Sequence, residues 1–329
     1  MNLSPFFNSY AGMYVAQSFC HSVIASIIAD QAVKLWKIDD PVIRQRFRLV
    51  VVLFPIFSFP LYQTLNPGRS SVLFRLGSLF DINQWLNMEI WGIIPFSILF
   101  LIVLAITSLI FLFQEMVPVL RHTLESKHAV HDGARTHADP FIERASNELS
   151  IETPEMLIVD DDEPVILSTT GKNPAILIST GLSKTLTPDE MQAALAHEIA
   201  HIARSRRPVL LVVFLLRVIM FFNPVVLVEF RRVVRNEEKI CDDIAVSITN
   251  RPEALAEALK KFYTVRDAPG PDVERPLFTP VRLEEYSYNM QLDTRITRLE
   301  QNTPRSAGGR WFSFMIVILI IAGISYFVV

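Results

Sequence analysis

TPDEMQAALAHEIAH, the stretch from Thr187 to His201, combines the start signal of a helix with a pattern that binds metal. Thr187 is a favourable N-cap residue, Pro188 suits the first helical position, and Glu190 follows the cap by three residues, as in a capping box. The predicted helix runs on through small apolar residues to His197 and His201, which stand four positions apart and share one face. Both imidazoles of such a pair can bind one ion at about 2.0 to 2.1 Å.

Glu198 comes directly after the first histidine and therefore lies away from the ligand face. A carboxylate beside a zinc site can take the proton of a water that attacks a peptide carbonyl and return it to the leaving amine. The HExxH pattern also occurs by chance in helices where its residues form only a polar face. The capped helix, its small apolar flanks and a suitable third ligand downstream favour the catalytic interpretation.

The third ligand is expected in RNEEKICDD, residues 235 to 243, which opens another predicted helix. Glu238 and Asp242 are four positions apart and share a face. Glu238 would complete the metal site, and Asp242 would accept a hydrogen bond from the outer nitrogen of one histidine, as metal-bound histidines require. The alternative is a solvated acidic helix start. For Cys241, a role as a small buried packing residue is favoured over contact with the metal.

The composition excludes several other classes of protein. Half of the 329 residues are hydrophobic and the mean hydropathy is +0.32, which indicates that part of the chain lies in lipid. The formal net charge is −3, and no block of Lys and Arg with interleaved aromatic residues indicates nucleic-acid binding. The two cysteines, Cys20 and Cys241, allow neither a disulfide framework nor a CxxC metal site. Histidines and carboxylates must therefore hold any metal.

Several apolar stretches approach the roughly 20 residues that a helix needs to cross a bilayer core about 30 Å thick. They contain no Asp, Glu, Lys or Arg, and they are Tyr10 to Ile28, Leu49 to Leu65, Ile90 to Gln114 and Trp311 to Val329. The second is short and carries two prolines that should kink it, so a buried core helix is the alternative there. No basic residue precedes the first stretch, so we expect a retained span there and no cleaved signal.

Basic residues between these stretches predict the orientation in the membrane. The connection between the first two is rich in them, with Lys34, Lys37, Arg44, Arg46 and Arg48. The next connection has Arg69 and Arg75 against Asp81 and Glu89. Because positive charge stays on the cytoplasmic side, we expect the N-terminus outside and the segment after the third span in the cytoplasm.

The composition after residue 114 becomes that of a soluble domain. Asp139 to Leu149 is predicted to form a short helix. Met156 to Val159, Val165 to Ser168 and Ala175 to Ser179 are short β-branched runs, separated by an acidic cluster and by a Gly-Lys-Asn-Pro turn. We therefore expect a small sheet that leads into the helix with the two histidines.

The apolar run from Pro208 to Val228 lies between the histidines and Glu238. If this run crossed the membrane once, Glu238 would be about 30 Å away from the imidazoles, whereas zinc ligation requires about 2.2 Å. Asn223-Pro224 interrupts the run, and a helix ending there would be only about 22 Å long. We therefore expect a re-entrant or interfacial hairpin near residues 208–230; the alternative is a true span with a nonfunctional histidine pair.

These features together resemble the gluzincin membrane metallopeptidases, in particular the bacterial beta-lactam sensor-transducer proteases. The resemblance rests on HEIAH at residues 197–201, on the apolar stretch ending at Asn223-Pro224, and on Glu238 to Asp242, which is similar to the ExxCD element of that family. The lead-in from Ala175 to His197 is also similar to the heat-shock and prenyl-protein membrane proteases. In all, the resemblance covers roughly residues 139 to 300, including RITRL at 295–299.

The resemblance implies specific roles for individual residues. It implies one Zn²⁺ ion with the ligands His197, His201 and Glu238, Glu198 as catalytic base, and Asp242 as a supporting residue. It further implies that extended substrate pairs with an edge strand, formed by Ala175, Ile176, Leu177, Ile178 and Ser179. The oxyanion-stabilising residue stays open, with Tyr286, Tyr288, Arg295 and Arg298 as candidates.

We thus expect a mainly α-helical chain with polytopic membrane helices and a gluzincin α+β zinc metalloprotease domain that carries a small sheet. Residues 1–115 would form a membrane domain with three spans, residues 116–305 the cytoplasm-facing protease domain, and residues 306–329 a C-terminal span. The expected function is an endopeptidase of a bacterial inner membrane that cuts a cytoplasmic or membrane-adjacent protein, in regulated or quality-control proteolysis.

Two alternatives to this function are weighed. One is a noncatalytic, zinc-stabilised membrane scaffold or signalling sensor. The other, a metal transporter, is disfavoured because the candidate spans lack acidic residues and His21 is their only histidine. The sensor-transducer proteases carry a large extracellular penicillin-binding domain, whereas this sequence ends at Val329, so direct beta-lactam binding is not expected.

Overall fold

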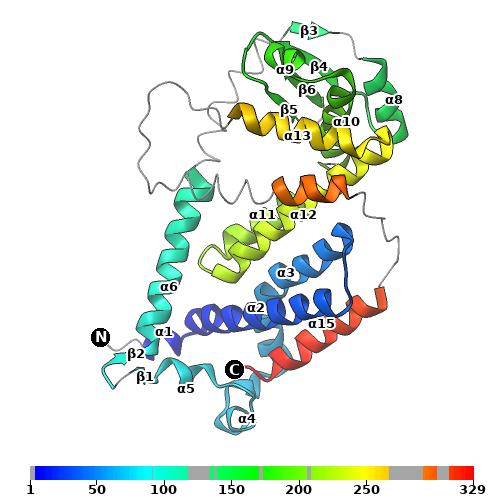
Figure 1. Ribbon diagram of the computed structural model, residues 1–329. Helices are drawn as coiled ribbons and strands as arrows, with labels where there is room; N and C mark the ends of the chain where they lie inside the picture. Colours follow the sequence, from blue (N-terminus) through cyan, green and yellow to red (C-terminus); the bar gives the residue numbers. More distant parts are fainter. Residues whose placement is uncertain are drawn as a thin grey trace. The chain divides into compact units, whose positions relative to one another are not determined.

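The computed structural model describes residues 4–90, 92–117, 134–136, 139–169, 173–205, 209–266, 292–301 and 311–329. The chain divides into two compact units, whose elements are labelled in Figure 1. The first unit comprises residues 1–123, 209–236 and 306–329, and the second comprises residues 124–208 and 237–305. The described residues are mainly helical with two small sheets, which confirms the predicted fold class.

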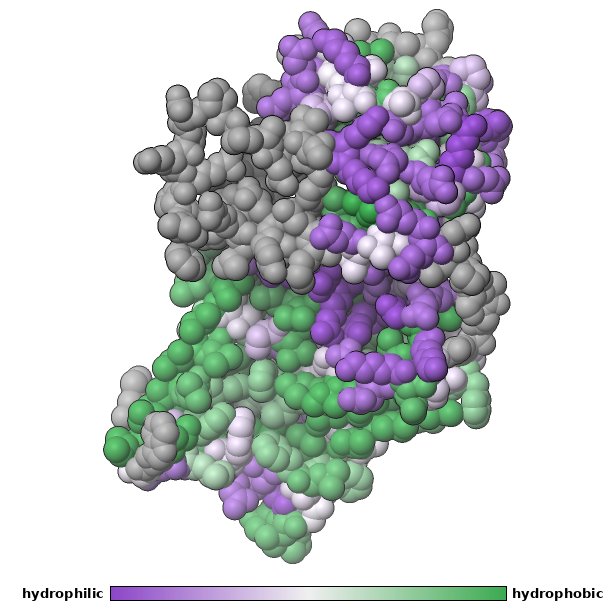
Figure 2. Space-filling view, in the orientation of Figure 1, coloured by the Kyte–Doolittle hydropathy of each residue, from purple (hydrophilic) through white to green (hydrophobic). Residues whose placement is uncertain are grey.

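The first unit contains α2 (Tyr10–Leu35), α3 (Pro41–Leu65) and α6 (Phe96–Phe111), which continues as a π-helical turn, η2 (Leu112–Met116). These three helices are long and apolar enough to cross a membrane. Their exposed side chains include Ile102, Ile106 and Leu109 on α6. In Figure 2, hydrophobic residues cover much of the visible surface of these helices, as expected for contact with lipid.

The bounds of the first three spans differ from the predicted ones. The Asp40 side chain accepts hydrogen bonds from the backbone N–H groups of Val42 and Ile43, so α3 begins at Pro41 instead of Leu49. The third span begins at Phe96 because β1 (Glu89–Ile90) and β2 (Ile94–Pro95) pair as an antiparallel hairpin.

The short helices of this unit are α1 (Ser4–Phe7), η1 (Pro67–Ser70), α4 (Val72–Leu76) and α5 (Ile82–Leu86).

The last helix, α15 (Trp311–Tyr326), packs against α2 and α3. Its length, about 24 Å, is short for a span, so its crossing of the membrane stays a prediction. The fully buried Arg69 donates hydrogen bonds to the carbonyls of Tyr326 at 2.9 Å and Ser325 at 3.1 Å. A guanidinium at the C-terminal end of a helix satisfies its last carbonyl groups, so Arg69 anchors α15.

His21 is buried inside this unit. Its Nδ1 lies 2.7 Å from the Ser58 hydroxyl, and its Nε2 lies 3.4 Å from the Val328 carbonyl oxygen. His21 is therefore a hydrogen-bonded packing residue, as its isolation in an apolar stretch indicated.

The apolar run after residue 208 forms two helices, α11 (Val209–Ile219) and α12 (Pro224–Thr249). The Asn223 side chain accepts a hydrogen bond from the Val225 N–H at 3.0 Å, and its amide donates to the Ser22 hydroxyl at 3.1 Å. Asn223 therefore caps α12 and binds it to α2. At about 16 Å, α11 is too short to span, which supports the hairpin; its placement in the membrane stays a prediction.

The second unit contains a four-stranded sheet with helices packed against it. Its strands are β3 (Ala134–Thr136), β4 (Glu155–Val159), β5 (Ile166–Thr169) and β6 (Ala175–Ser179), in the order β3-β4-β6-β5. β4 and β6 are parallel, and the other pairs are antiparallel. The helices are α8 (Pro140–Glu148), α9 (Thr180–Thr185), α10 (Pro188–Ser205), α13 (Pro252–Arg266) and a further one at residues 292–300.

The structure corrects the predicted substrate strand. The five residues of β6, namely Ala175, Ile176, Leu177, Ile178 and Ser179, lie between β4 and β5 and are all buried. Ile176, for example, pairs with Met156 on one side and with Ser168 on the other. The backbone groups of β6 are therefore engaged on both sides and cannot accept a peptide. Among the described strands, the edges are β3 and β5, and β5 lies against α10.

Candidate metal centre

The helix α10 carries the two predicted histidine ligands, and its start is fixed by a capping box. The Thr187 N–H donates to Glu190 Oε2 at 2.8 Å, and the Glu190 N–H donates to Thr187 Oγ1 at 3.4 Å. Small residues such as Ala193 and Ala196 are fully buried, so neighbouring elements approach the helix closely. The predicted helix start and its small-residue face are thus confirmed.

His197, His201 and Glu238 come together as a group that can hold one metal ion. The two Nε2 atoms are 3.1 Å apart. That of His197 lies 3.6 Å from Glu238 Oε2, and that of His201 lies 3.6 Å from Glu238 Oε1. Two donor atoms bound at about 2.0 to 2.1 Å in a tetrahedral site are about 3.4 Å apart. The donor set and its spacing therefore fit a single zinc ion, although the ligands stand about forty positions apart in the sequence.

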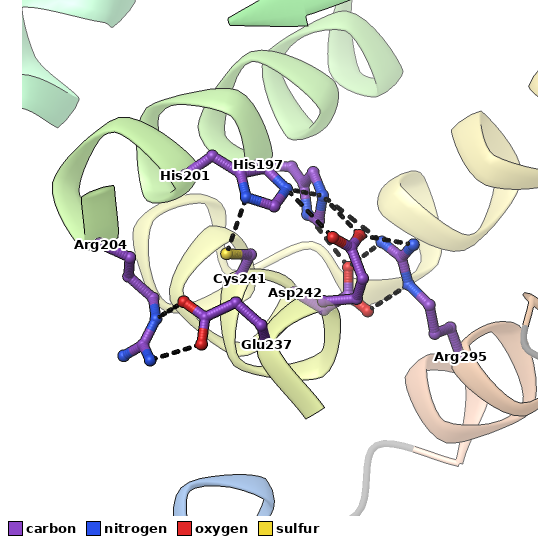
Figure 3. A network of polar contacts seen from close by, with 8 residues as sticks. His197, His201, Arg204, Glu237, Cys241, Asp242 and Arg295 are labelled. Atoms are coloured by element: carbon purple, nitrogen blue, oxygen red, sulfur yellow. Dashed lines mark hydrogen bonds and ion pairs between the residues drawn. The ribbon is translucent and has the colours of Figure 1, made fainter. Parts of the chain in front are cut away.

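The outer nitrogens of both histidines face α12 (Figure 3). His197 Nδ1 lies 3.1 Å from Asp242 Oδ1, within ion-pair distance but without the alignment of a hydrogen bond. His201 Nδ1 lies 3.4 Å from Cys241 Sγ. Asp242 thus lies beside His197, the kind of partner predicted for it. The contact of Cys241 with His201 was not predicted. The signal was present in the sequence, because residues 238, 241 and 242 share one helix face.

Arg295, on the helix at residues 292–300, contacts both carboxylates of this face (Figure 3). Its Nε and Nη2 donate to the two oxygens of Asp242 at 2.8 and 2.7 Å, and its Nη1 donates to Glu238 Oε2 at 3.0 Å. Arg298, the other basic candidate for the oxyanion, instead donates to Asp243 at 2.6 Å. Tyr286 and Tyr288 lie outside the described residues.

These contacts control the charges of the site. Burial alone would raise the pKa of Glu238, but its contacts with His197, Arg295 and His201 lower that pKa to about 2. The pKa of Asp242 likewise lies well below its usual range, because Arg295 and His197 outweigh its burial. Burial raises the pKa of the Cys241 thiol and keeps it neutral. Both carboxylates of this helix face are therefore ionised.

Two further ion pairs connect the same elements. Glu237, which is buried, accepts hydrogen bonds from Arg204 on α10, including one from Nη2 to Oε2 at 2.7 Å. Asp243 on α12 pairs with Arg298 on the helix at 292–300. Neither acidic residue is only surface charge, which was the alternative considered for this stretch. These two ion pairs hold α12 against α10, which carries His201, and against the helix at 292–300, which carries Arg295.

Known proteins share parts of this sequence. A family model described as BlaR1 peptidase M56 matches residues 83–267. "Protease HtpX" of Psychrobacter sp. (strain PRwf-1) is 41% identical over 64 residues, which cover 19% of this chain and 21% of the relative. "Protease HtpX" of Glaesserella parasuis serovar 5 (strain SH0165) is 29% identical over 136 residues, which cover 40% and 47%.

The chain thus spans less than half the length of these curated relatives. Its three long apolar helices make it an integral membrane protein. The family model covers more than half of the 329 residues and includes the whole stretch from His197 to Asp242. The resemblance found in the sequence is therefore confirmed, and the chain belongs to the BlaR1 peptidase M56 family.

Proposed function

We propose that this chain is a membrane-embedded, zinc-dependent endopeptidase. The observation that carries the proposal is the convergence of His197, His201 and Glu238, whose donor atoms are spaced as one tetrahedral ion requires. Two imidazoles and one carboxylate are the protein ligands of many catalytic zinc sites, which keep a further position for water or substrate. The same donor set suits magnesium or calcium poorly, because those ions prefer oxygen ligands.

Glu198 is the proposed general base. It directly follows His197 on α10, so it lies on the same turn of the helix as a proposed ligand, and it is half-buried. A zinc ion here would polarise the peptide carbonyl and lower the pKa of the attacking water. Glu198 would accept the proton of that water and deliver it to the leaving amine nitrogen. Asp242 would hold the His197 ring through Nδ1, so that Nε2 faces the ion.

We assign substrate binding to β5, in place of the strand predicted from the sequence. Its residues Ile166 to Thr169 pair with β6 on one side, and their other side is unpaired among the described strands. β5 also lies against α10, which carries His197 and His201. An extended peptide that adds to this edge would be held by main-chain hydrogen bonds, with little demand on its sequence.

The substrate is proposed to be a cytoplasmic or membrane-adjacent protein, cleaved in regulation or in quality control. The basic residues at the end of α2, at the start of α3 and between them support a cytoplasmic face for the site, in a bacterial inner membrane. In the structure Arg48 is engaged in ion pairs within the first unit.

The test uses the full chain purified in detergent. We expect one zinc per chain by elemental analysis and cleavage of an unfolded protein such as casein. Glu198→Gln should lower kcat/KM by about 10² to 10⁴, the usual contribution of a general base, while keeping the zinc. The exposed carboxylate of Glu253, changed in the same way, is the matched control and should have no effect.

Other outcomes would overturn the proposal in distinct ways. Zinc binding without any cleavage would favour the noncatalytic, zinc-stabilised scaffold. Cleavage that survives in Glu198→Gln would show that another group, or a contaminating protease, is responsible. A chain that binds no zinc would remove the basis of the metal site itself.

A further inference from the structure

We propose that Arg295 is a positioning residue of the metal centre, which holds Asp242 and Glu238 in the arrangement that binds zinc. The inference rests on the proposed function, because it concerns the same site. Arg295 reaches the site from residues 292–300, more than fifty positions after the helix face that it contacts. Its side chain is 11% exposed, so the contact is formed in a largely desolvated environment.

The two carboxylates need such a cation. Glu238 and Asp242 are one turn apart on α12, where like charges repel each other. Asp242 is 1% exposed, so its charge has lost nearly all contact with water. The three donors of Arg295 that bind the two side chains lie 2.7 to 3.0 Å from their oxygens. Arg295 thus compensates both charges at once.

The shape of the guanidinium makes this role specific for arginine. Nε and Nη2 form two parallel hydrogen bonds to one carboxylate, while Nη1 donates to the other. A lysine carries its donors on a single atom and cannot reproduce this planar geometry. The positive charge alone is therefore insufficient, and Arg295→Lys should behave as a loss of function at this site.

The same contacts connect Arg295 to a metal ligand. Asp242 Oδ1 accepts from Arg295 Nη2 and also lies 3.1 Å from His197 Nδ1. Fixing the Asp242 carboxylate therefore fixes the partner of the His197 ring, and Nη1 fixes one oxygen of Glu238 directly. Arg295 was a candidate for stabilising the oxyanion, but the bonds of its Nε, Nη1 and Nη2 to these carboxylates favour the positioning role.

Arg298 offers a matched control one turn further along the same helix. It also binds α12, donating to Asp243 at 2.6 Å and to the Lys239 carbonyl at 3.3 Å, but it contacts no proposed metal ligand. Arg298→Lys therefore tests the general effect of replacing an arginine between these two helices. Asp242→Asn tests the other end of the Arg295 contact.

The experiment measures zinc affinity of the full chain in detergent by competition with a chromogenic chelator, alongside kcat and KM at saturating zinc. We expect Arg295→Lys and Arg295→Gln to weaken zinc binding 10- to 100-fold, the range known for outer partners of metal ligands. Arg298→Lys should change it less than about threefold. The double variant Arg295→Gln/Asp242→Asn should lose less zinc-binding free energy than the two single variants lose in sum, because both changes break the contact between Arg295 and Asp242.

Each other outcome is decisive. Wild-type zinc affinity in both Arg295 variants overturns the positioning role. Unchanged zinc affinity with a lower kcat at saturating zinc would assign Arg295 to the reacting groups instead. If Arg295→Gln does not fold, Arg295→Lys, which keeps the charge, still carries the test. If the wild-type chain binds no zinc, the proposed function itself is overturned. If the wild-type chain cleaves normally and the Arg295 variants keep its zinc affinity, kcat and KM, only this inference is overturned.

Discussion

The two halves of α12 both carry acidic side chains, but they balance them differently. In the first half, Glu229 is 1% exposed and contacts Arg232 at 2.7 Å and Arg48 at 3.3 Å. Asp30 on α2 contacts the same two arginines. Two carboxylates therefore meet two guanidinium groups, and the cluster is neutral without any added ion.

In the second half, two carboxylates share one guanidinium. Glu238 and Asp242 both contact Arg295, while Glu237 and Asp243 are balanced by arginines of their own. With both histidines neutral, as metal ligands must be, the shared pair leaves one excess negative charge beside His197 and His201. An unbalanced acidic cluster next to histidines thus favours binding of a cation, whereas a balanced one only holds helices together.

Breaking the balanced cluster should have the largest effect on stability. Arg48→Met leaves Glu229 and Asp30 with one guanidinium between them, and removal of one partner of a buried ion pair costs about 3–5 kcal/mol. We expect the free energy of unfolding, measured with urea in detergent, to fall by that amount without a change in zinc affinity. The exposed Arg46 on the same helix, changed to Met, should shift it by less than about 0.5 kcal/mol.

Breaking the unbalanced cluster should instead affect metal binding. Glu238→Gln removes a proposed ligand, so zinc affinity should fall more than 100-fold, beyond the 10- to 100-fold cost of losing an outer partner. Equilibrium competition with a chelator measures it. A variant that bound zinc normally would contradict the assignment of Glu238, and the search for the third ligand would have to restart from the other acidic residues of α12.

Zinc itself should stabilise the chain only through the second cluster. At a free concentration 100 times its Kd, a ligand that binds only the folded state adds about 2.7 kcal/mol to the free energy of unfolding. We expect this gain in the wild type and equally in Arg48→Met, but not in Glu238→Gln. Thermal unfolding with and without a chelator measures it, and a similar gain in all three proteins would place the zinc elsewhere.

The smallest effect is expected at the pair between Arg298 and Asp243. Both side chains are about one-fifth exposed, and partly solvated pairs of this kind contribute about 1 kcal/mol or less. Arg298→Ala should therefore lower the free energy of unfolding by about that amount and leave cleavage unchanged. A large loss of zinc binding in this variant would show that the helix at 292–300 acts as a whole, and that Arg295 has no separate role.

Local features of the sequence predicted much of the site. The capping box at Thr187 is a local sequence pattern. The pairing of the two histidines, and that of Glu238 with Asp242, follow from the periodicity of one helix each. None of these predictions needed knowledge of the fold. The start of α3 was missed because the prediction excluded its charged first turns. The Asp40-Pro41 pair, an N-cap followed by a proline, was nevertheless a usable signal.

Long-range features could not be predicted in this way. Strand order depends on pairing between distant segments, so the sequence of β6 could not show that β5 would cover its second edge. Its nearly continuous apolar run, Ala175 to Ile178, was a hint in the sequence, because such runs are typical of interior strands. The contact of Arg295 with Asp242 joins residues 53 positions apart, and the fold alone decides which carboxylate each arginine meets.

The discontinuity of the second unit has a practical consequence for biochemistry. Because residues 209–236 belong to the first unit, any single polypeptide that carries both His201 and Glu238 must include α11 and the start of α12. α11 exposes Leu211 and Leu215, at 60% and 55%. A truncated protein that lacks the early spans should therefore still require detergent, and its behaviour in plain buffer would report on aggregation more than on proteolysis.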